Sequence, residues 1–115
     1  MKKLSVTDVE AAEVPEPANG VKIRWLIDEK TGATNFAMRH FEIAPGGNTP
    51  LHSHRWEHEV FILSGRGVVT SEEGETEFGP GDAIWMPGGE EHNFRNTSPE
   101  PVTMLCLIPI DTTTK

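Results

Sequence analysis

Short apolar segments, each closed by a turn signal, constrain the fold of this chain more than any other feature. In residues 21–28 apolar and polar side chains alternate, which is typical of a strand with one buried face. Turn clusters such as Pro87-Gly88-Gly89 separate the segments at short intervals, and no helical period persists beyond a turn or two near residues 7–13. The sequence therefore predicts an all-β fold, either a sandwich or a barrel. Strands are expected at residues 21–28, 35–43, 60–63, 66–70, 76–78, 83–86, 92–95 and 102–108.

The length of 115 residues fits one domain with a single core. Residues 10–20 are acidic and contain prolines, so they are expected to form a surface arm after a short first strand. We therefore divide the chain into an N-terminal strand and arm, residues 1–20, and a β-barrel domain, residues 21–115.

Composition narrows the range of partners. The formal net charge is −8 without a basic stripe, so neither nucleic acid nor an anionic membrane is expected to bind, and a small-molecule substrate is. The sequence has no long uncharged apolar run, and acidic residues interrupt its start, so we expect no membrane span, no signal peptide and a cytoplasmic location. Cys106 is the one cysteine, which excludes an internal disulfide and zinc sites built on several cysteines.

Four of the five histidines lie in two short stretches. His52, His54 and His58 fall within seven residues, and His92 follows the turn at residues 87–89. Imidazole is the commonest metal-ligating side chain in proteins, so this clustering predicts a metal site.

Strand geometry sets conditions on how these rings can meet. His52 and His54 are two residues apart, so on a strand they would project side by side, with Cα atoms roughly 6–7 Å apart. A straight strand would carry His58 roughly 13 Å beyond His54. The chain is therefore expected to turn at residues 55–57 and return His58 on a neighbouring strand, while His92 arrives from a third.

Glu59 competes with His58 as a ligand, because both faces of residues 58–63 are apolar and alternation does not choose between them. Burying a carboxylate without a partner is costly, whereas a histidine can be buried neutral. We therefore favour His58 facing inward, with Glu59 turned toward an outer face or a partner subunit. His40, the fifth histidine, is interpreted as an ordinary strand residue.

At these residues the sequence resembles the cupin superfamily. The first motif of that family, G-x5-H-x-H-x3-4-E-x6-G, is matched at Gly46, His52, His54 and Gly65, with His58 in place of the glutamate. The second motif, G-x5-P-x-G-x2-H-x3-N, is matched at every spacing by Gly81, Pro87, Gly89, His92 and Asn96. The histidine in place of glutamate is similar to small single-domain cupins that hold manganese or another divalent ion with four histidines.

The resemblance implies a jelly-roll β-barrel of the double-stranded β-helix type and a homodimer. It implies manganese or another divalent ion, one per chain, held by His52, His54, His58 and His92. Imidazole ligands also suit iron, nickel, copper and zinc, and we expect manganese or iron with the other three as alternatives. Four neutral imidazoles would leave the ion its full +2 charge, which strengthens its attraction for oxygen ligands and anions at its open positions.

Strand position also suggests which side chains surround the ion. The residues expected to line the pocket are Arg39, Phe94, Met104, Cys106 and Ile108. Arg39 could hold a substrate carboxylate or form a solvated surface pair. Cys106 lies in the cavity if its strand face is inward and otherwise fills a small place in the core. Trp56 and Trp85 are interpreted as packing residues.

Three classes of function fit these residues. The first is a dioxygenase-type oxidoreductase, with a small organic molecule and its oxidant at open positions of the metal. The second is a Lewis-acid isomerase or decarboxylase of a sugar or small oxo-acid, for which no general base is evident. The third is a non-catalytic module that binds a metal or metabolite.

Overall fold

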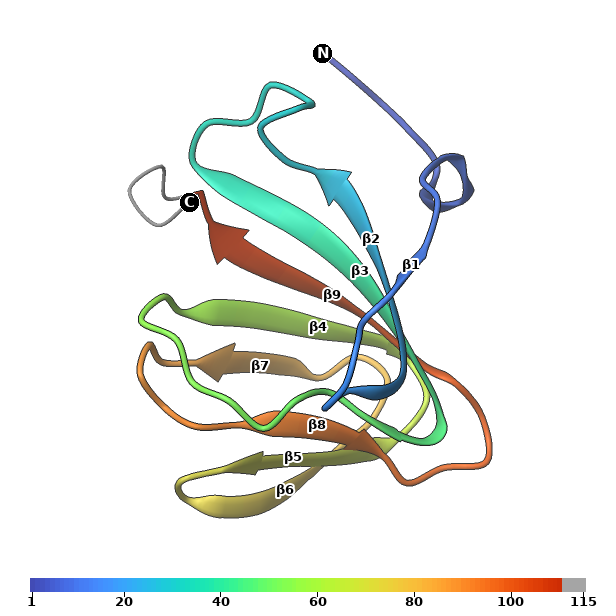
Figure 1. Cartoon of the computed structure of the whole chain (residues 1–115), viewed down its shortest axis with the longest axis vertical. Coiled ribbons are helices and arrows are strands. Elements are labelled where there is room, and N and C mark those ends of the chain that lie inside the picture. The colour runs from blue at the N-terminus through green and yellow to red at the C-terminus, as the bar shows by residue number, and fades with distance from the viewer. Residues whose placement is uncertain (111–115) are drawn as a thin grey trace.

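A computed structural model describes residues 1–110 of the chain (Figure 1). In this part of the chain a 3-10 helix, η1 at Val6–Asp8, precedes the strands. The strands are β1 (Ala12–Glu13), β2 (Asn19–Ile27), β3 (Phe36–Asn48), β4 (His58–Ser64), β5 (Gly67–Ser71), β6 (Gly74–Phe78), β7 (Ala83–Met86), β8 (Asn93–Asn96) and β9 (Val102–Pro109). Each of the eight segments expected as strands between residues 21 and 108 forms one, and the predicted jelly-roll barrel is confirmed. The short first strand expected before residue 10 does not form, and η1 lies there instead.

The strands pair antiparallel in one curled sheet. Their order is β6-β5-β8-β3-β9-β4-β7, with β2 paired to β3 and β1 paired to β2. The last strand, β9, lies between β3 and β4, so that Cys106 stands opposite Arg39 on one side and Val60 on the other (Figure 1). Strands distant in sequence therefore supply the side chains that meet inside the barrel.

One end of the barrel, which we call the sealed end, is filled by Ile43, Ile62 and Val102. All three are fully buried, and Ile43 stands opposite Val102 in the β3–β9 pair. Ile62 stands opposite Met104, which is also fully buried. Burial of each such side chain stabilises the fold by roughly 1.5–3 kcal/mol, so this end anchors the barrel.

The N-terminal arm packs on the barrel. Its short strand β1 pairs with β2, and beyond β1 the backbone N–H of Val14 donates to the carbonyl of Val21 at 2.9 Å. The Arg24 Nε donates to the carbonyl of Val9 at 3.0 Å, and Ala18 is buried in the core. The helical turn expected near residues 7–13 is the single 3-10 turn of η1. Within residues 1–110, no helix has the length and apolar character needed to cross a bilayer.

The outward side chains of β4 and β7 form an apolar outer face made of Phe61, Leu63 and Trp85. Their exposed fractions are 45%, 43% and 61%. The interpretation of Trp85 as a packing residue is therefore wrong for this chain, because its ring lies on the surface, where its N–H donates to Glu57 at 3.1 Å. Large apolar side chains gathered on a sheet surface are typical of a protein–protein contact.

Candidate metal centre

Two connecting segments bring the first histidines together. His52 and His54 lie on the segment between β3 and β4, and His92 lies just before β8. His52 and His92 form one isolated bridge, in which each backbone N–H donates to the other carbonyl, at 3.2 and 3.0 Å. The regular strand expected through His52 and His54 is absent from this segment, because its pairing is limited to that bridge and Pro50 has no N–H to donate.

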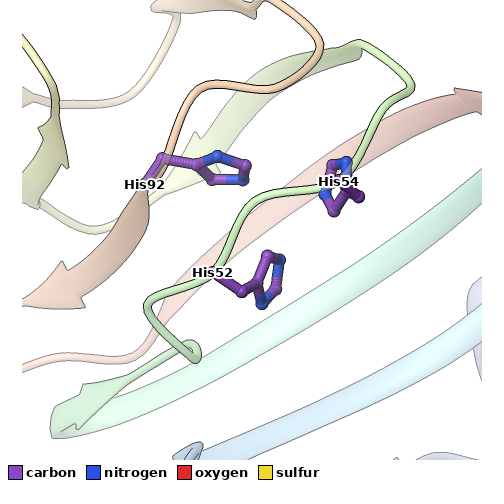
Figure 2. A group of neighbouring side chains, drawn as sticks. All are labelled: His52, His54 and His92. Atoms are coloured by element: carbon purple, nitrogen blue, oxygen red, sulfur yellow. The ribbon is translucent and has the colours of Figure 1, made fainter.

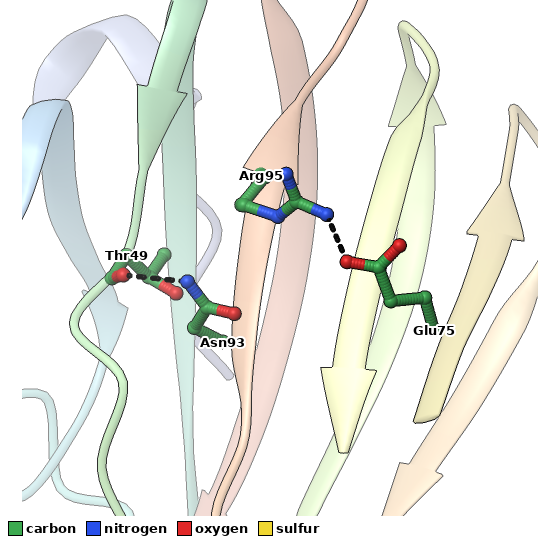
Figure 3. Close-up of polar contacts among 4 residues, drawn as sticks. All are labelled: Thr49, Glu75, Asn93 and Arg95. Atoms are coloured by element: carbon green, nitrogen blue, oxygen red, sulfur yellow. Dashed lines mark hydrogen bonds and ion pairs between the residues drawn. The ribbon is translucent and has the colours of Figure 1, made fainter. Parts of the chain in front are cut away.

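Thr49 fastens the His52 segment to β8. Its backbone N–H donates to the Phe94 carbonyl, and its hydroxyl accepts the Phe94 N–H, both at 2.9 Å. The Asn93 amide donates to the Thr49 carbonyl at 3.4 Å (Figure 3). Further along β8, Arg95 pairs with Glu75 of β6, so the strand that follows His92 is tied on both sides.

The turn before His92 closes onto the His54 segment. The N–H of Gly89 donates to the His54 carbonyl at 2.7 Å. A Cβ at Gly88 would lie 2.2 Å from the Arg55 carbonyl oxygen, and Gly89 has a φ of +83°. Only glycine fits both requirements, which gives Gly89 of the second motif and its neighbour Gly88 a physical role.

The rings of His52, His54 and His92 converge (Figure 2). Their centroids are 5.1 Å apart for His52–His54 and 5.3 Å apart for each of the other two pairs. Each ring offers a ligand nitrogen, and these nitrogens all lie within 4.8 Å of one another. The three rings therefore form a group able to bind one ion.

His58 begins β4 and lies beside this group. Its ring is buried, with an exposed fraction of 7%, and stacks on His54 at 4.3 Å with 20° between the ring planes. Its centroid is 5.3 Å from that of His92. The three-histidine group within 4.8 Å does not include His58, so its place as fourth ligand stays a prediction. Glu59 is exposed on the other face of β4, opposite Trp85, in the orientation expected when His58 faces inward.

Hydrogen bonds at the Nδ1 atoms orient these rings. The Nδ1 atoms of His54 and His92 lie 3.0 and 2.8 Å from the carbonyls of Trp56 and Glu90. A carbonyl only accepts, so each Nδ1 carries the proton and leaves the lone pair on Nε2. The Nδ1 of His58 lies 3.5 Å from the Cys106 sulfur.

Two of the Nε2 atoms are buried without a partner among the described residues. These are Nε2 of His54 and Nε2 of His58. A buried polar atom without a hydrogen bond is costly, and metal-binding histidines present this pattern of an anchored Nδ1 and an unengaged Nε2. The residues present therefore fit a divalent ion.

Partial burial of His52 and His54 and the deeper burial of His58 favour the neutral form of these three imidazoles. Burial lowers the pKa of His52 and of His54, and it lowers the pKa of His58 to about 3. The positive charge of Arg39 adds to the effect of burial on all three. Because a ligand nitrogen must be unprotonated, the rings are available to a metal at neutral pH.

A cavity of about 260 Å³ opens beside the histidines, and it forms what we call the open end of the barrel. Four of the five residues expected in the pocket line it, namely Arg39, Phe94, Met104 and Cys106. Ile108 does not, because β9 has run past the cavity at that point and places Ile108 opposite Ala37. His40 also lies outside the lining, opposite Arg24 of β2.

Seven other residues line the cavity but were not predicted as pocket residues from the sequence, namely Val14, Ile23, Phe41, Thr49, Pro50, Trp56 and Val60. Phe41 and Val60 share strand parity with Arg39 and His58, so alternation could have found them. Val14 belongs to the arm, whose path over the cavity has no local signal. Trp56 stacks on His54 at 4.5 Å with 7° between the rings, so it packs against a histidine of the site.

Sequence comparison relates this site to known proteins. The family described as "Cupin domain" matches residues 39–108. The 1-methylthio-D-xylulose 5-phosphate methylsulfurylase of Rhodospirillum rubrum is 35% identical over 71 residues, which cover 62% of this chain and 46% of that protein. The chain spans about half the length of the curated relatives it matches.

Solved structures share the fold. The polyketide cyclase RemF from Streptomyces resistomycificus has a TM-score of 0.90 and 38% identity, covering 96% of this chain and 80% of that one. A sugar phosphate isomerase from Silicibacter pomeroyi has a TM-score of 0.82, covering 96% of this chain and 76% of that one. Its identity is 22%, so the likeness to the isomerase shows the fold alone.

Proposed function

Because the chain belongs to the cupin family, we propose that it is a metal-dependent enzyme acting on a small, largely apolar organic molecule. One divalent ion per chain would be held by His52, His54, His58 and His92. The observation that carries the proposal is the pair of buried, unpartnered Nε2 atoms beside three converging imidazoles.

Manganese or iron is the metal we favour, on the resemblance to small four-histidine cupins. Nickel, copper and zinc also accept imidazole ligands. A bound ion would supply Lewis-acid chemistry to a substrate oxygen and, if it is a redox metal, electron transfer to an oxidant. The chain itself supplies imidazole ligands, a largely apolar cavity wall and the guanidinium of Arg39.

The reaction we favour is Lewis-acid chemistry on a carbonyl compound, such as a ring-closing condensation. Similarity to a polyketide cyclase over most of both chains supports this choice. The apolar lining, which includes Phe41, Val60 and Phe94, supports a substrate with an apolar body. Isomerisation of a sugar has weaker support, because sugar hydroxyls need many polar partners and the lining offers few.

Dioxygenase-type oxidation is the second candidate. The donor set of neutral imidazoles suits iron, which can bind an oxidant as well as a substrate. This donor set is the support for the oxidoreductase expected from the sequence.

Metal loading and oxygen dependence test these proposals together. Purified protein should contain about one divalent ion per chain by elemental analysis, and protein that takes up no ion would contradict the metal site. Aromatic β-dicarbonyl compounds are then incubated with manganese-loaded and iron-loaded protein, with and without O2. Turnover without O2 supports the Lewis-acid reaction, whereas turnover coupled to O2 consumption supports the dioxygenase. A protein that binds the ion yet turns over none of these compounds under either condition supports a non-catalytic module.

The homodimer expected from the resemblance is proposed to form through the apolar outer face of Phe61, Leu63 and Trp85. These aromatic and aliphatic side chains are about half exposed, and burying them against a second copy would remove that apolar surface from water. Sedimentation should give a dimer for the wild type and a monomer for Phe61→Glu. Thr76→Glu, on exposed β6, should stay dimeric. A monomeric wild type, or a dimeric Phe61→Glu, would contradict this interface.

A further inference from the structure

We propose that Arg39 forms a carboxylate subsite beside the metal centre, so that the substrate is a small organic acid with an apolar body. The inference rests on the proposed function in placing the substrate in this cavity. It goes further in naming the charge and shape of the group that is recognised.

Arg39 is the only residue with a permanent charge among those that line the cavity. No carboxylate of residues 1–110 forms an ion pair with it, and the rest of the lining is apolar side chains, imidazoles, Thr49 and Cys106. A guanidinium in such surroundings is costly to desolvate unless an anion joins it. The cavity therefore lacks one negative group, which a ligand can supply.

The guanidinium has donors to spare. Its one hydrogen bond to the described residues runs from Nη2 to the Cys106 sulfur at 2.9 Å, and sulfur is a weak acceptor. Its Nε is buried without a partner. A planar carboxylate can accept two parallel N–H bonds from this fork, which a neutral oxygen ligand does not match.

Two aromatic rings hold the guanidinium in place. Its Cζ lies 5.0 Å from the centroid of Phe41 and 5.4 Å from that of Trp25. Cation–π contacts of this kind fix the plane of the group before a ligand arrives, which lowers the entropy lost on binding. The Cys106 sulfur lies between Arg39 and His58 and contacts both, so the subsite adjoins the histidine cluster.

The rest of the lining argues for a carboxylate on an apolar body and against a sugar phosphate. Val14, Ile23, Val60 and Phe94 give the wall no hydrogen-bonding side chain. The Thr49 hydroxyl already accepts the Phe94 N–H. Apart from Arg39, Thr49 and the imidazoles, sugar hydroxyls placed here would find no side-chain partners to replace water.

The test compares benzoate with benzamide, which have the same shape and differ in charge. Binding is measured by calorimetry to metal-free and manganese-loaded protein. Wild type should prefer benzoate by at least about tenfold in both forms, as expected for a charge-assisted bidentate pair. Arg39→Met should abolish the preference in metal-free protein. Arg39→Lys should keep part of it, and the surface control Arg95→Met should keep all of it.

Metal content is measured on the same samples. A benzoate preference that survives Arg39→Met in metal-free protein would overturn the subsite, as would absence of benzoate binding or tighter binding of glycerol phosphate. If wild type takes up no ion but loses its benzoate preference on Arg39→Met, the metal proposal fails and the subsite stands. Thermal unfolding of Arg39→Met should match wild type, which separates loss of binding from loss of fold.

Discussion

The sealed end and the open end of the barrel are built from the same strands, yet one is packed solid and the other holds a cavity. On β4, Ile62 fills the sealed end, whereas His58, four residues earlier on the same face, enters the open end. The strands continue through both ends with the same alternation. The two ends differ in the segments that lie across them. The His52 and His92 segments cross the open end and bring imidazoles there, whereas the sealed end is filled by aliphatic side chains. Stability and chemistry are therefore separated along the barrel axis, and substitutions at the two ends should separate them too.

The largest expected effect is loss of metal on His52→Ala. His52 is exposed, so its removal should leave the free energy of unfolding of the metal-free protein almost unchanged. His52 supplies one of three converging ligand nitrogens. Loss of a residue that only hydrogen-bonds to a ligand lowers metal affinity by 10–100-fold, so loss of the ligand itself should lower it further, by about 1000-fold, or about 4 kcal/mol. Metal titration of the variant and of His40→Ala, a histidine outside the cavity, checks this. If His52→Ala and His40→Ala bound metal with equal affinity, metal binding could not be assigned to the open end.

Ile62→Ala should show the opposite behaviour. Ile62 is fully buried at the sealed end, so truncation should lower the free energy of unfolding by about 3 kcal/mol through lost burial and a residual cavity. Denaturant unfolding of the metal-free protein measures this. Metal affinity of the folded variant should change by less than about twofold, and a large loss of affinity would mean that packing at the sealed end also sets the positions of the histidines.

Gly88→Ala tests the loops that distinguish the open end. A Cβ there would lie 2.2 Å from the backbone carbonyl of Arg55, so the His54 segment must shift. We expect metal affinity to fall by about tenfold, since small displacements of a ligand segment weaken a metal site. Gly79→Ala is the matched control, because its added Cβ meets the flexible Arg66 side chain. Equal metal affinities of the two variants would argue against this role for the turn.

The strands could be predicted because alternation and Gly/Pro turns are local signals, and they were correct across residues 21–108. The histidine cluster could be predicted because its spacing is that of two motifs. The path of the His52 segment could not, since it depends on hydrogen bonds between Thr49 and Phe94, two residues distant in sequence. The contribution of Val14 depends on how the arm lies over the cavity. Ile108 shows that strand parity gives the face of a residue but not where along the barrel it lies.

The smallest expected effect concerns how acid acts on the open end. The pKa of His58 is lowered to about 3, chiefly by burial, so the folded metal-free protein leaves His58 neutral while the unfolded chain protonates it near pH 6.5. The unfolded state therefore binds more protons below pH 6.5, and stability must fall as the pH is lowered from there toward 3. Between pH 6.5 and 5.5, the free energy of unfolding of His58→Gln should fall by about 1 kcal/mol less than that of the wild type. Most carboxylates titrate below this pH range. Ile62→Ala should lower stability at both pH values without changing this difference. Identical pH dependence in wild type and His58→Gln would mean that the buried histidine does not couple the open end to folding.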